Sequence, residues 1–171
     1  MKKKTIVIII LALFILSWIY IIYRLSNMNT SNSNGKSTDI ISVFIEDSLE
    51  ITNNMGITNS HPNDAKITKA SNLLNAPLRK VMHALVYFVL AIMIIILTSI
   101  IIKKKTYLKL FIITIISIIL LASLDEYHQT FIDGRTGQFK DVIIDTAGGL
   151  TGILFYSTYY LTYHIAYKKG K

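Results

Sequence analysis

Ionisable and polar side chains interrupt three otherwise apolar stretches of this sequence at intervals of three or four residues. Residues at these intervals share one face of an α-helix, so each stretch predicts a polar stripe along a helix. Carboxyl and imidazole groups in such stripes can transfer protons or bind a divalent metal. The stripes are Arg79, His83 and Tyr87; Asp125, His128 and Gln129; and Asp141 and Asp145, with Glu126 at the same helix end as the second stripe.

Arginine usage adds an indication of a binding site. The chain carries most of its positive charge on lysine and has three arginines, of which Arg79 and Arg135 lie in or beside the stripes. A guanidinium group holds a carboxylate or a phosphate through two parallel hydrogen bonds, which lysine cannot do. We therefore predict ligand binding by Arg79, His83, Tyr87, Gln129 and Arg135.

Four long apolar runs are expected to position these side chains. They cover residues 5–23, 81–102, 110–124 and 142–163, and each contains at most one histidine or one aspartate. A bilayer core requires about 20 apolar residues of helix, which all four runs roughly supply. The sequence thus predicts an all-α, polytopic membrane protein with four transmembrane helices. The first run follows three lysines but is longer than a signal-peptide core, so we interpret it as a permanent anchor.

The distribution of charge predicts the orientation of these helices. Ten lysines and no acidic residue occupy the N-terminal tail, residues 103–109 and the C-terminal tail. By the positive-inside rule these three segments lie in the cytoplasm, so both termini of this cell-membrane protein are expected there. The net charge of +8 therefore reflects topology, and we expect no nucleic-acid partner. The absence of cysteine excludes a disulfide and a thiolate metal site.

The chain divides into four predicted parts: an anchor (1–23), an extracytoplasmic segment (24–76), a membrane core (77–167) and a basic tail (168–171). The extracytoplasmic segment begins with a polar, Ser/Asn-rich stretch that we expect to be mobile. Apolar residues then recur at helical spacing, which predicts two short amphipathic helices on the outer leaflet or packed as a lid on the bundle. Those residues are Ile41, Phe44, Ile45 and Leu49, then Ile67, Ala70, Leu74 and Leu78.

Alternation of the spans brings the three stripes to one face of the membrane. The outer ends of the second, third and fourth spans carry the stripes, and we expect the second helix to begin near Pro77. Between the third and fourth spans, Asp133-Gly134 predicts a turn. Small residues at Gly148, Gly149 and Gly152 predict close approach of another helix to the fourth span.

The polar stripes and the glycines of the fourth run resemble those of the VanZ-like family, which is named for a membrane protein associated with low-level teicoplanin resistance. The resemblance covers about residues 77–155. Ala84 departs from it, since an aromatic residue often follows the histidine, and the extracytoplasmic segment is longer than expected. The matching elements are Arg79-Lys80-x-x-His83 with Tyr87, Asp125-Glu126-x-x-Gln129-x-Phe131, Gly134-Arg135, and Asp141-x-x-x-Asp145-x-x-Gly148-x-x-x-Gly152.

The resemblance implies a protein of the Gram-positive cell envelope that contributes to antibiotic resistance. It would bind or modify an outer-leaflet lipid or a lipid-linked cell-wall precursor, with membrane lipids as its other partners. A second hypothesis is an intramembrane acid/base or metal-dependent enzyme acting on a phosphorylated lipid. However, the sequence has no HExxH or DxD motif, serine elbow or phosphate loop, so we assign no catalytic role, metal or cofactor. A third is purely structural, an ion network that joins three helices. The catalytic candidates are Asp125, Glu126, Asp141, Asp145 and His83.

Overall fold

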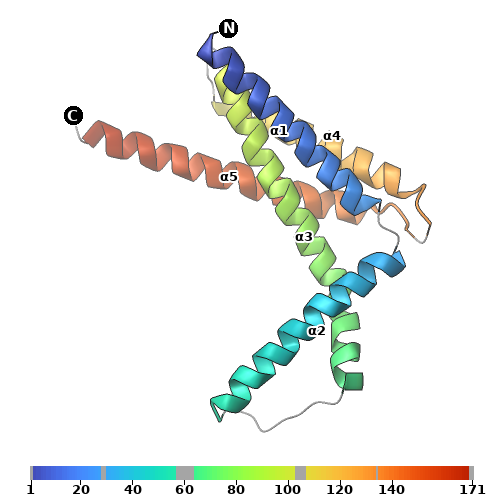
Figure 1. Ribbon diagram of the computed structural model, residues 1–171. Helices are drawn as coiled ribbons and strands as arrows, with labels where there is room; N and C mark the ends of the chain where they lie inside the picture. Colours follow the sequence, from blue (N-terminus) through green and yellow to red (C-terminus); the bar gives the residue numbers. More distant parts are fainter. Residues whose placement is uncertain (1, 28–29, 57–63, 103–106, 134, 170–171) are drawn as a thin grey trace.

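The computed structural model describes residues 2–27, 30–56, 64–102, 107–133 and 135–169. Within these ranges the chain forms five helices and no strand (Figure 1), which confirms the all-α class. Gly134 lies outside the described residues, so the predicted turn at Asp133-Gly134 is not described. The helices are α1 (Lys3–Ser26), α2 (Thr30–Asn54), α3 (Asp64–Ile101), α4 (Tyr107–Gln129) and α5 (Phe139–Lys169).

Three segments of the described chain are long and apolar enough to cross a membrane. They are Lys3–Ser26, Asn72–Ile101 within α3, and Tyr107–Gln129. Their outward faces carry large exposed apolar side chains, as expected where lipid replaces water. Helix α5 has 31 residues but is not among the three, because two aspartates, three glycines and many hydroxylated residues dilute its apolar character. The membrane-protein class is therefore supported, and the fourth span remains a prediction.

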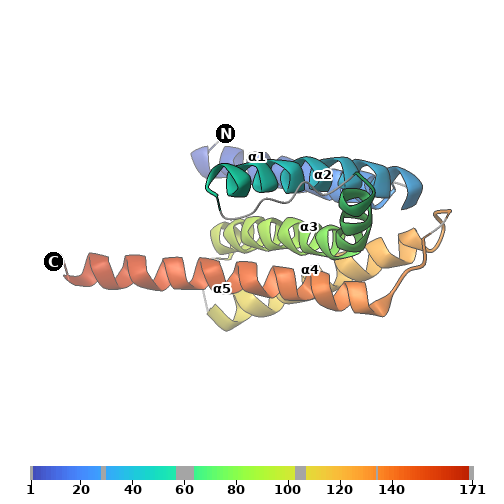
Figure 2. The ribbon, with the colours of Figure 1, turned by 90° about the horizontal axis from the view of Figure 1, so that it is seen from below.

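Helix α3 is the centre of the bundle, since it contacts each of the other four described helices. Figure 2 shows the start of α1 and the end of α5 at the same end of the bundle. Trp18 joins α1 to α3, because its indole Nε1 donates a hydrogen bond to the carbonyl oxygen of Val86 at 3.0 Å. The first apolar helix is thus packed into the bundle through Trp18, Ile15 and Ile22.

The segment of residues 24–76 differs from its predicted form. The Ser/Asn-rich stretch is helical from Thr30 onward, within a 25-residue helix that contacts only α3 in the described part of the chain. Of its predicted apolar stripe, Ile41 is buried, but Phe44 is 73% exposed. The second predicted amphipathic helix is the first part of α3, where the side chain of Ile67 lies outside the described residues.

Pro77 does not begin a helix, as the sequence suggested, but lies inside α3. A proline within a helix removes one backbone hydrogen bond and its ring pushes against the preceding turn, so the axis bends. Figure 1 shows this change of direction between the first turns of α3 and the long remainder that crosses the bundle. The prediction divided α3 into two helices at Pro77, because proline at a first turn is more common than proline inside a helix.

The predicted glycine contacts on α5 are present and involve two neighbouring helices. A methyl group on Gly148 would overlap the carbonyl oxygen of Ala84, and one on Gly152 would overlap that of Phe88. Both contacts are with the backbone of α3. A methyl group on Gly149 would instead lie 2.7 Å from a side-chain carbon of Ile118 in α4. These glycines therefore let α5 pack tightly against both α3 and α4.

Replacing Gly148 by valine should lower the thermal unfolding midpoint of the detergent-solubilised protein. The added side chain must displace the α3 backbone, and overpacking of this kind costs about 1–3 kcal/mol. The matched control is Ala147→Val, because Ala147 is the preceding residue of the same helix and is exposed. Equal midpoints for the two variants would contradict the packing described here.

Candidate functional site

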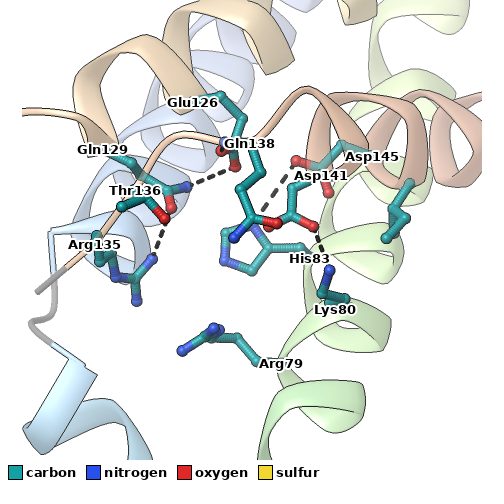
Figure 3. A pocket seen from close by; sticks show the side chains of 11 residues that line it. Arg79, Lys80, His83, Glu126, Gln129, Arg135, Thr136, Gln138, Asp141 and Asp145 are labelled. Atoms are coloured by element: carbon teal, nitrogen blue, oxygen red, sulfur yellow. Dashed lines mark hydrogen bonds and ion pairs between the residues drawn. The ribbon is translucent and has the colours of Figure 1, made fainter.

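A polar cavity of about 210 Å³ lies where α3, α4 and α5 meet (Figure 3). It opens at the end of the bundle where α4 ends and α5 begins, and at about 30 Å³ per water molecule it has room for a phosphate-sized anion. Seven of the nine predicted site residues line it, and Asp125 and Tyr87 do not. The lining residues are Arg79, Lys80, His83, Glu126, Gln129, Arg135, Thr136, Gln138, Asp141, Ile144 and Asp145.

Arg79 and Arg135 form the cationic side of the cavity. Figure 3 shows their guanidinium groups on the side away from Asp145. Nη1 of Arg135 donates a hydrogen bond to Oε1 of Gln129 at 3.2 Å, whereas its buried Nε has no partner among the described residues. Burial, and then the positive charge of Arg79, lowers the pKa of the Arg135 guanidinium. Two guanidinium groups that repel each other favour an anion between them.

Lys80 is a site residue that the sequence reasoning did not select. Its Nζ lies 2.6 Å from Oδ1 of Asp141, and both side chains are partly exposed. This ion pair connects α3 to the first turn of α5. Lys80 follows Arg79 in the sequence, but at helical spacing it does not share the face of Arg79, His83 and Tyr87, so it was not predicted as a site residue.

Glu126 connects the end of α4 to the start of α5. The side chain is 5% exposed. Its Oε1 accepts a hydrogen bond from Nε2 of Gln129 at 3.0 Å, and its Oε2 accepts one from the backbone N–H of Gln138 at 2.8 Å. Gly137 permits this approach, because a Cβ there would overlap the carbonyl oxygen of Glu126. The carboxylate therefore satisfies a backbone N–H just before α5, as a capping side chain does.

Asp125 is tied to the N-terminal helix by a residue that the sequence reasoning missed. Ser26, the last residue of α1, donates a hydrogen bond from Oγ to Oδ2 of Asp125 at 2.7 Å. The same oxygen accepts a longer bond of 3.3 Å from Nε2 of Gln129. The predicted shared face of Asp125 and Gln129 is thus present. No periodic signal marks Ser26, because it lies at the end of an apolar run and is one of many serines.

Asp145 is the most deeply buried acid of the site. It is 1% exposed, and neither carboxylate oxygen has a hydrogen-bond partner in the described part of the chain. Nδ1 of His83 lies 3.9 Å from its Oδ2. Burial of a carboxyl group without a hydrogen-bond partner is costly, so this environment calls for a partner or a function.

Tyr87 and His128 lie away from the cavity lining. Tyr87, predicted to bind ligand, is 1% exposed and does not line the cavity, because it lies one turn deeper in the bundle than His83. Its hydroxyl group has no hydrogen-bond partner among the described residues. His128 belongs to α4, and its ring lies 4.8 Å from that of Tyr23.

The sequence model of the VanZ/LLP1 family matches residues 11–161, most of the chain. The chain belongs to the VanZ/LLP1 family. No curated protein and no solved structure matches it. The family match extends beyond the expected residues 77–155 and includes α1 and α2, so the helix that carries Trp18 and Ser26 is part of the VanZ/LLP1 region.

The matched VanZ/LLP1 motifs converge on the cavity, although they come from three separate helices and a loop. His83 and Asp145 meet across the α3–α5 contact, and Glu126 bonds the segment before α5. Phe131 does not join them, because it is 70% exposed and packs edge-on against Tyr127. The arrangement combines cations that can bind an anion with carboxyl groups that can exchange protons.

Glu126→Ala should loosen the start of α5. The backbone N–H of Gln138 would lose its charged acceptor, and a hydrogen bond to a charged group contributes about 1.5–3 kcal/mol. We expect faster amide hydrogen exchange at residues 138–141 and a lower unfolding midpoint. Asp133→Ala, which removes an exposed acid from the same loop, should change neither quantity. Unaltered exchange in the Glu126 variant would show that this carboxylate does not hold the helix.

Proposed function

We propose that this VanZ/LLP1 protein binds the phosphorylated head group of an outer-leaflet lipid or lipid-linked cell-wall precursor. The observation that carries the proposal is the pair of arginines in the cavity. Among the described residues neither Arg79 nor Arg135 forms an ion pair, although four carboxyl groups lie in the same site. Two guanidinium groups left without carboxylates are available for a phosphate, which they bind with planar, paired hydrogen bonds.

A neighbouring apolar groove favours a lipid over free phosphate. The groove has a volume of about 730 Å³ and lies between α2 and the bend of α3. Leu78 and Val81, which line it, flank Arg79 and Lys80 in the sequence. A phosphate held by the arginines would therefore have an apolar surface close by for the hydrocarbon chain of the same molecule. The groove is lined by Ile41, Phe44, Ile45, Ser48, Leu49, Leu74, Pro77, Leu78 and Val81.

Arg135→Lys should weaken binding of a polyprenyl phosphate in nanodiscs about tenfold, because lysine keeps the charge but loses the paired hydrogen bonds. Lys140→Gln is the matched control, since Lys140 is an exposed cation near the cavity that does not line it. Microscale thermophoresis would compare both variants with the unaltered protein. Equal affinities for the two variants would contradict the arginine site. If inorganic phosphate at the same concentration displaced the polyprenyl phosphate completely, the cavity would still be an anion site, but the proposed specificity for a lipid would be wrong.

The proposed function requires the cavity to face outward, with four spans and both termini in the cytoplasm. The three lysine-only segments support this orientation by the positive-inside rule. The common position of the start of α1 and the end of α5 fits an even number of crossings (Figure 2). In this arrangement α5 is the fourth span, and residues 24–76 lie on the outer side with their amphipathic helices at the leaflet surface.

The orientation can be tested by cysteine labelling, because the chain has no cysteine of its own. In intact cells a membrane-impermeant maleimide should label Asp133→Cys in the loop before α5. It should label Lys3→Cys and Lys109→Cys only after the membrane is permeabilised. Labelling of either lysine position from outside would overturn the orientation, and the outward-facing site with it.

We also propose that lipid or precursor binding reduces the effect of teicoplanin. The support is membership of the VanZ/LLP1 family together with a cavity suited to a phosphorylated membrane ligand. Teicoplanin carries a lipid tail, so a protein that alters access to an envelope lipid or precursor can change its action. Expression of Arg135→Lys should then give less tolerance than expression of the Lys140→Gln control at equal protein levels.

A second candidate is an acid/base enzyme acting on the same phosphorylated lipid. The observation in its favour is that Glu126, Asp141 and Asp145 line the cavity that also contains the arginines. Such carboxyl groups lie where a bound phosphate ester would be within reach of a proton donor or acceptor. The two candidates can be separated by incubating the purified protein with a polyprenyl diphosphate and measuring the phosphate released. An enzyme releases phosphate, whereas a binding protein leaves the substrate intact.

A further inference from the structure

A histidine and two aspartates from three helices lie together beside the anion cavity. His83 of α3, Asp125 of α4 and Asp145 of α5 each offer one ligand atom, and these three atoms lie within 4.8 Å of one another. Both aspartates are buried and the histidine is half-buried. We propose that this triad binds one divalent cation of the Mn²⁺ or Zn²⁺ class, which goes beyond the lipid binding proposed above.

The strongest support is the environment of Asp145. Its side chain is almost fully buried, and both oxygens lack a hydrogen-bond partner within the described ranges. The distance of 3.9 Å to Nδ1 of His83 is too long for a hydrogen bond. Two ligands about 2.0–2.2 Å from a tetrahedral ion lie roughly 3.3–3.6 Å apart, so this pair would close by a few tenths of an ångström around a shared ion. Separations within the triad that approach 4.8 Å would close by roughly 1–1.5 Å on binding.

Asp125 is oriented as a metal ligand would be. Ser26 and Gln129 both donate hydrogen bonds to its Oδ2, at 2.7 and 3.3 Å, and no described residue hydrogen-bonds Oδ1. Outer hydrogen bonds of this kind fix the direction of a ligating carboxylate. They come from α1 and α4, so the position of Asp125 is set from two sides before any ion is bound.

The balance of charge also favours a cation at the triad. Four carboxyl groups of the site face three cationic side chains, and one of these, Lys80, is paired with Asp141. The two arginines extend toward the other side of the cavity (Figure 3). Within the described site, no cationic side chain lies against Asp145 except His83 when it is protonated. A divalent ion would supply the missing positive charge where it is needed.

The donor set indicates which ions would bind. Mg²⁺ and Ca²⁺ prefer sites built from oxygen alone, whereas imidazole is a preferred donor for Zn²⁺ and other transition metals. One imidazole with two carboxylates therefore suits Mn²⁺ or Zn²⁺ better than Mg²⁺. The remaining coordination positions would be taken by water or by an oxygen of a ligand in the adjoining cavity.

The first test measures metal binding by the full chain, purified in a neutral detergent and stripped with a chelator. Titration with Mn²⁺, followed by electron paramagnetic resonance of the free ion, should give one bound ion per chain; Zn²⁺ should compete for it and Mg²⁺ should compete poorly. His83→Gln and Asp145→Asn should each weaken Mn²⁺ binding tenfold or more. The control Asp133→Asn removes an exposed acid of the nearby loop and should not change the affinity.

A second measurement locates the ion without altering the triad. The spectrum of a nitroxide on Asp133→Cys, in the loop four residues after the end of the Asp125-bearing helix α4, should be broadened by one equivalent of Mn²⁺. A nitroxide on Leu108→Cys should not, because Leu108 is exposed at the opposite end of α4, about 26 Å of helix rise from Asp125. No lipid phosphate is present in either experiment, so their outcome is separate from that of the lipid-binding test.

Three results would overturn the metal site. The first is the lack of stoichiometric binding of either Mn²⁺ or Zn²⁺ by the unaltered chain. The second is unchanged affinity in both His83→Gln and Asp145→Asn when these variants are folded. The third is equal broadening of the spectra of the two nitroxides by Mn²⁺. This measurement leaves the triad unaltered, so it remains decisive even if a triad variant fails to fold.

Discussion

Burial of the Asp145 carboxyl group is the constraint around which this bundle is arranged. A carboxylate buried so deeply is stable only if neighbouring groups or a bound ion offset the loss of water. The helix that carries it packs against α3 through glycines, which brings His83 to within 3.9 Å. The surrounding hydrogen bonds of Glu126 and Asp125 then hold α4 and α1 at the same point. Packing and electrostatics thus depend on one another at this end of the molecule.

Much of this arrangement is predictable from the sequence, because two periodic signals determine it. Apolar run length located the three helices that are long and apolar enough to cross a membrane. Spacing of three and four residues then identified the stripes, and the glycine pattern identified the tight face of α5. Helix alternation brought Arg79, Asp125 and Asp145 to one end without any knowledge of side-chain contacts. These predictions succeed because they depend on backbone geometry alone.

Other features depend on tertiary contacts and leave no periodic trace. Ser26 is distinguished only by its neighbour Asp125, and Lys80 only by its ion pair with Asp141. Pro77 has the same local preference at a helix start as at a bend, so sequence alone could not separate the two. Tyr87 shares the stripe of His83 but lies one turn deeper, where the bundle closes over it. Spacing predicts a face of a helix, whereas depth along that face depends on packing.

The hydrogen bond between Ser26 and Asp125 joins residues 99 positions apart, which has a consequence for biogenesis. At synthesis rates of about 5–20 residues per second, the serine waits roughly 5–20 s for its acceptor to be translated. Asp145 emerges later still, so the acidic end of α4 is complete before its last helical neighbour exists. A nascent chain interrupted before α5 therefore leaves Oε2 of Glu126 without the backbone N–H of Gln138. Such an incomplete chain differs from the finished protein in the polarity that it exposes at this end of the bundle.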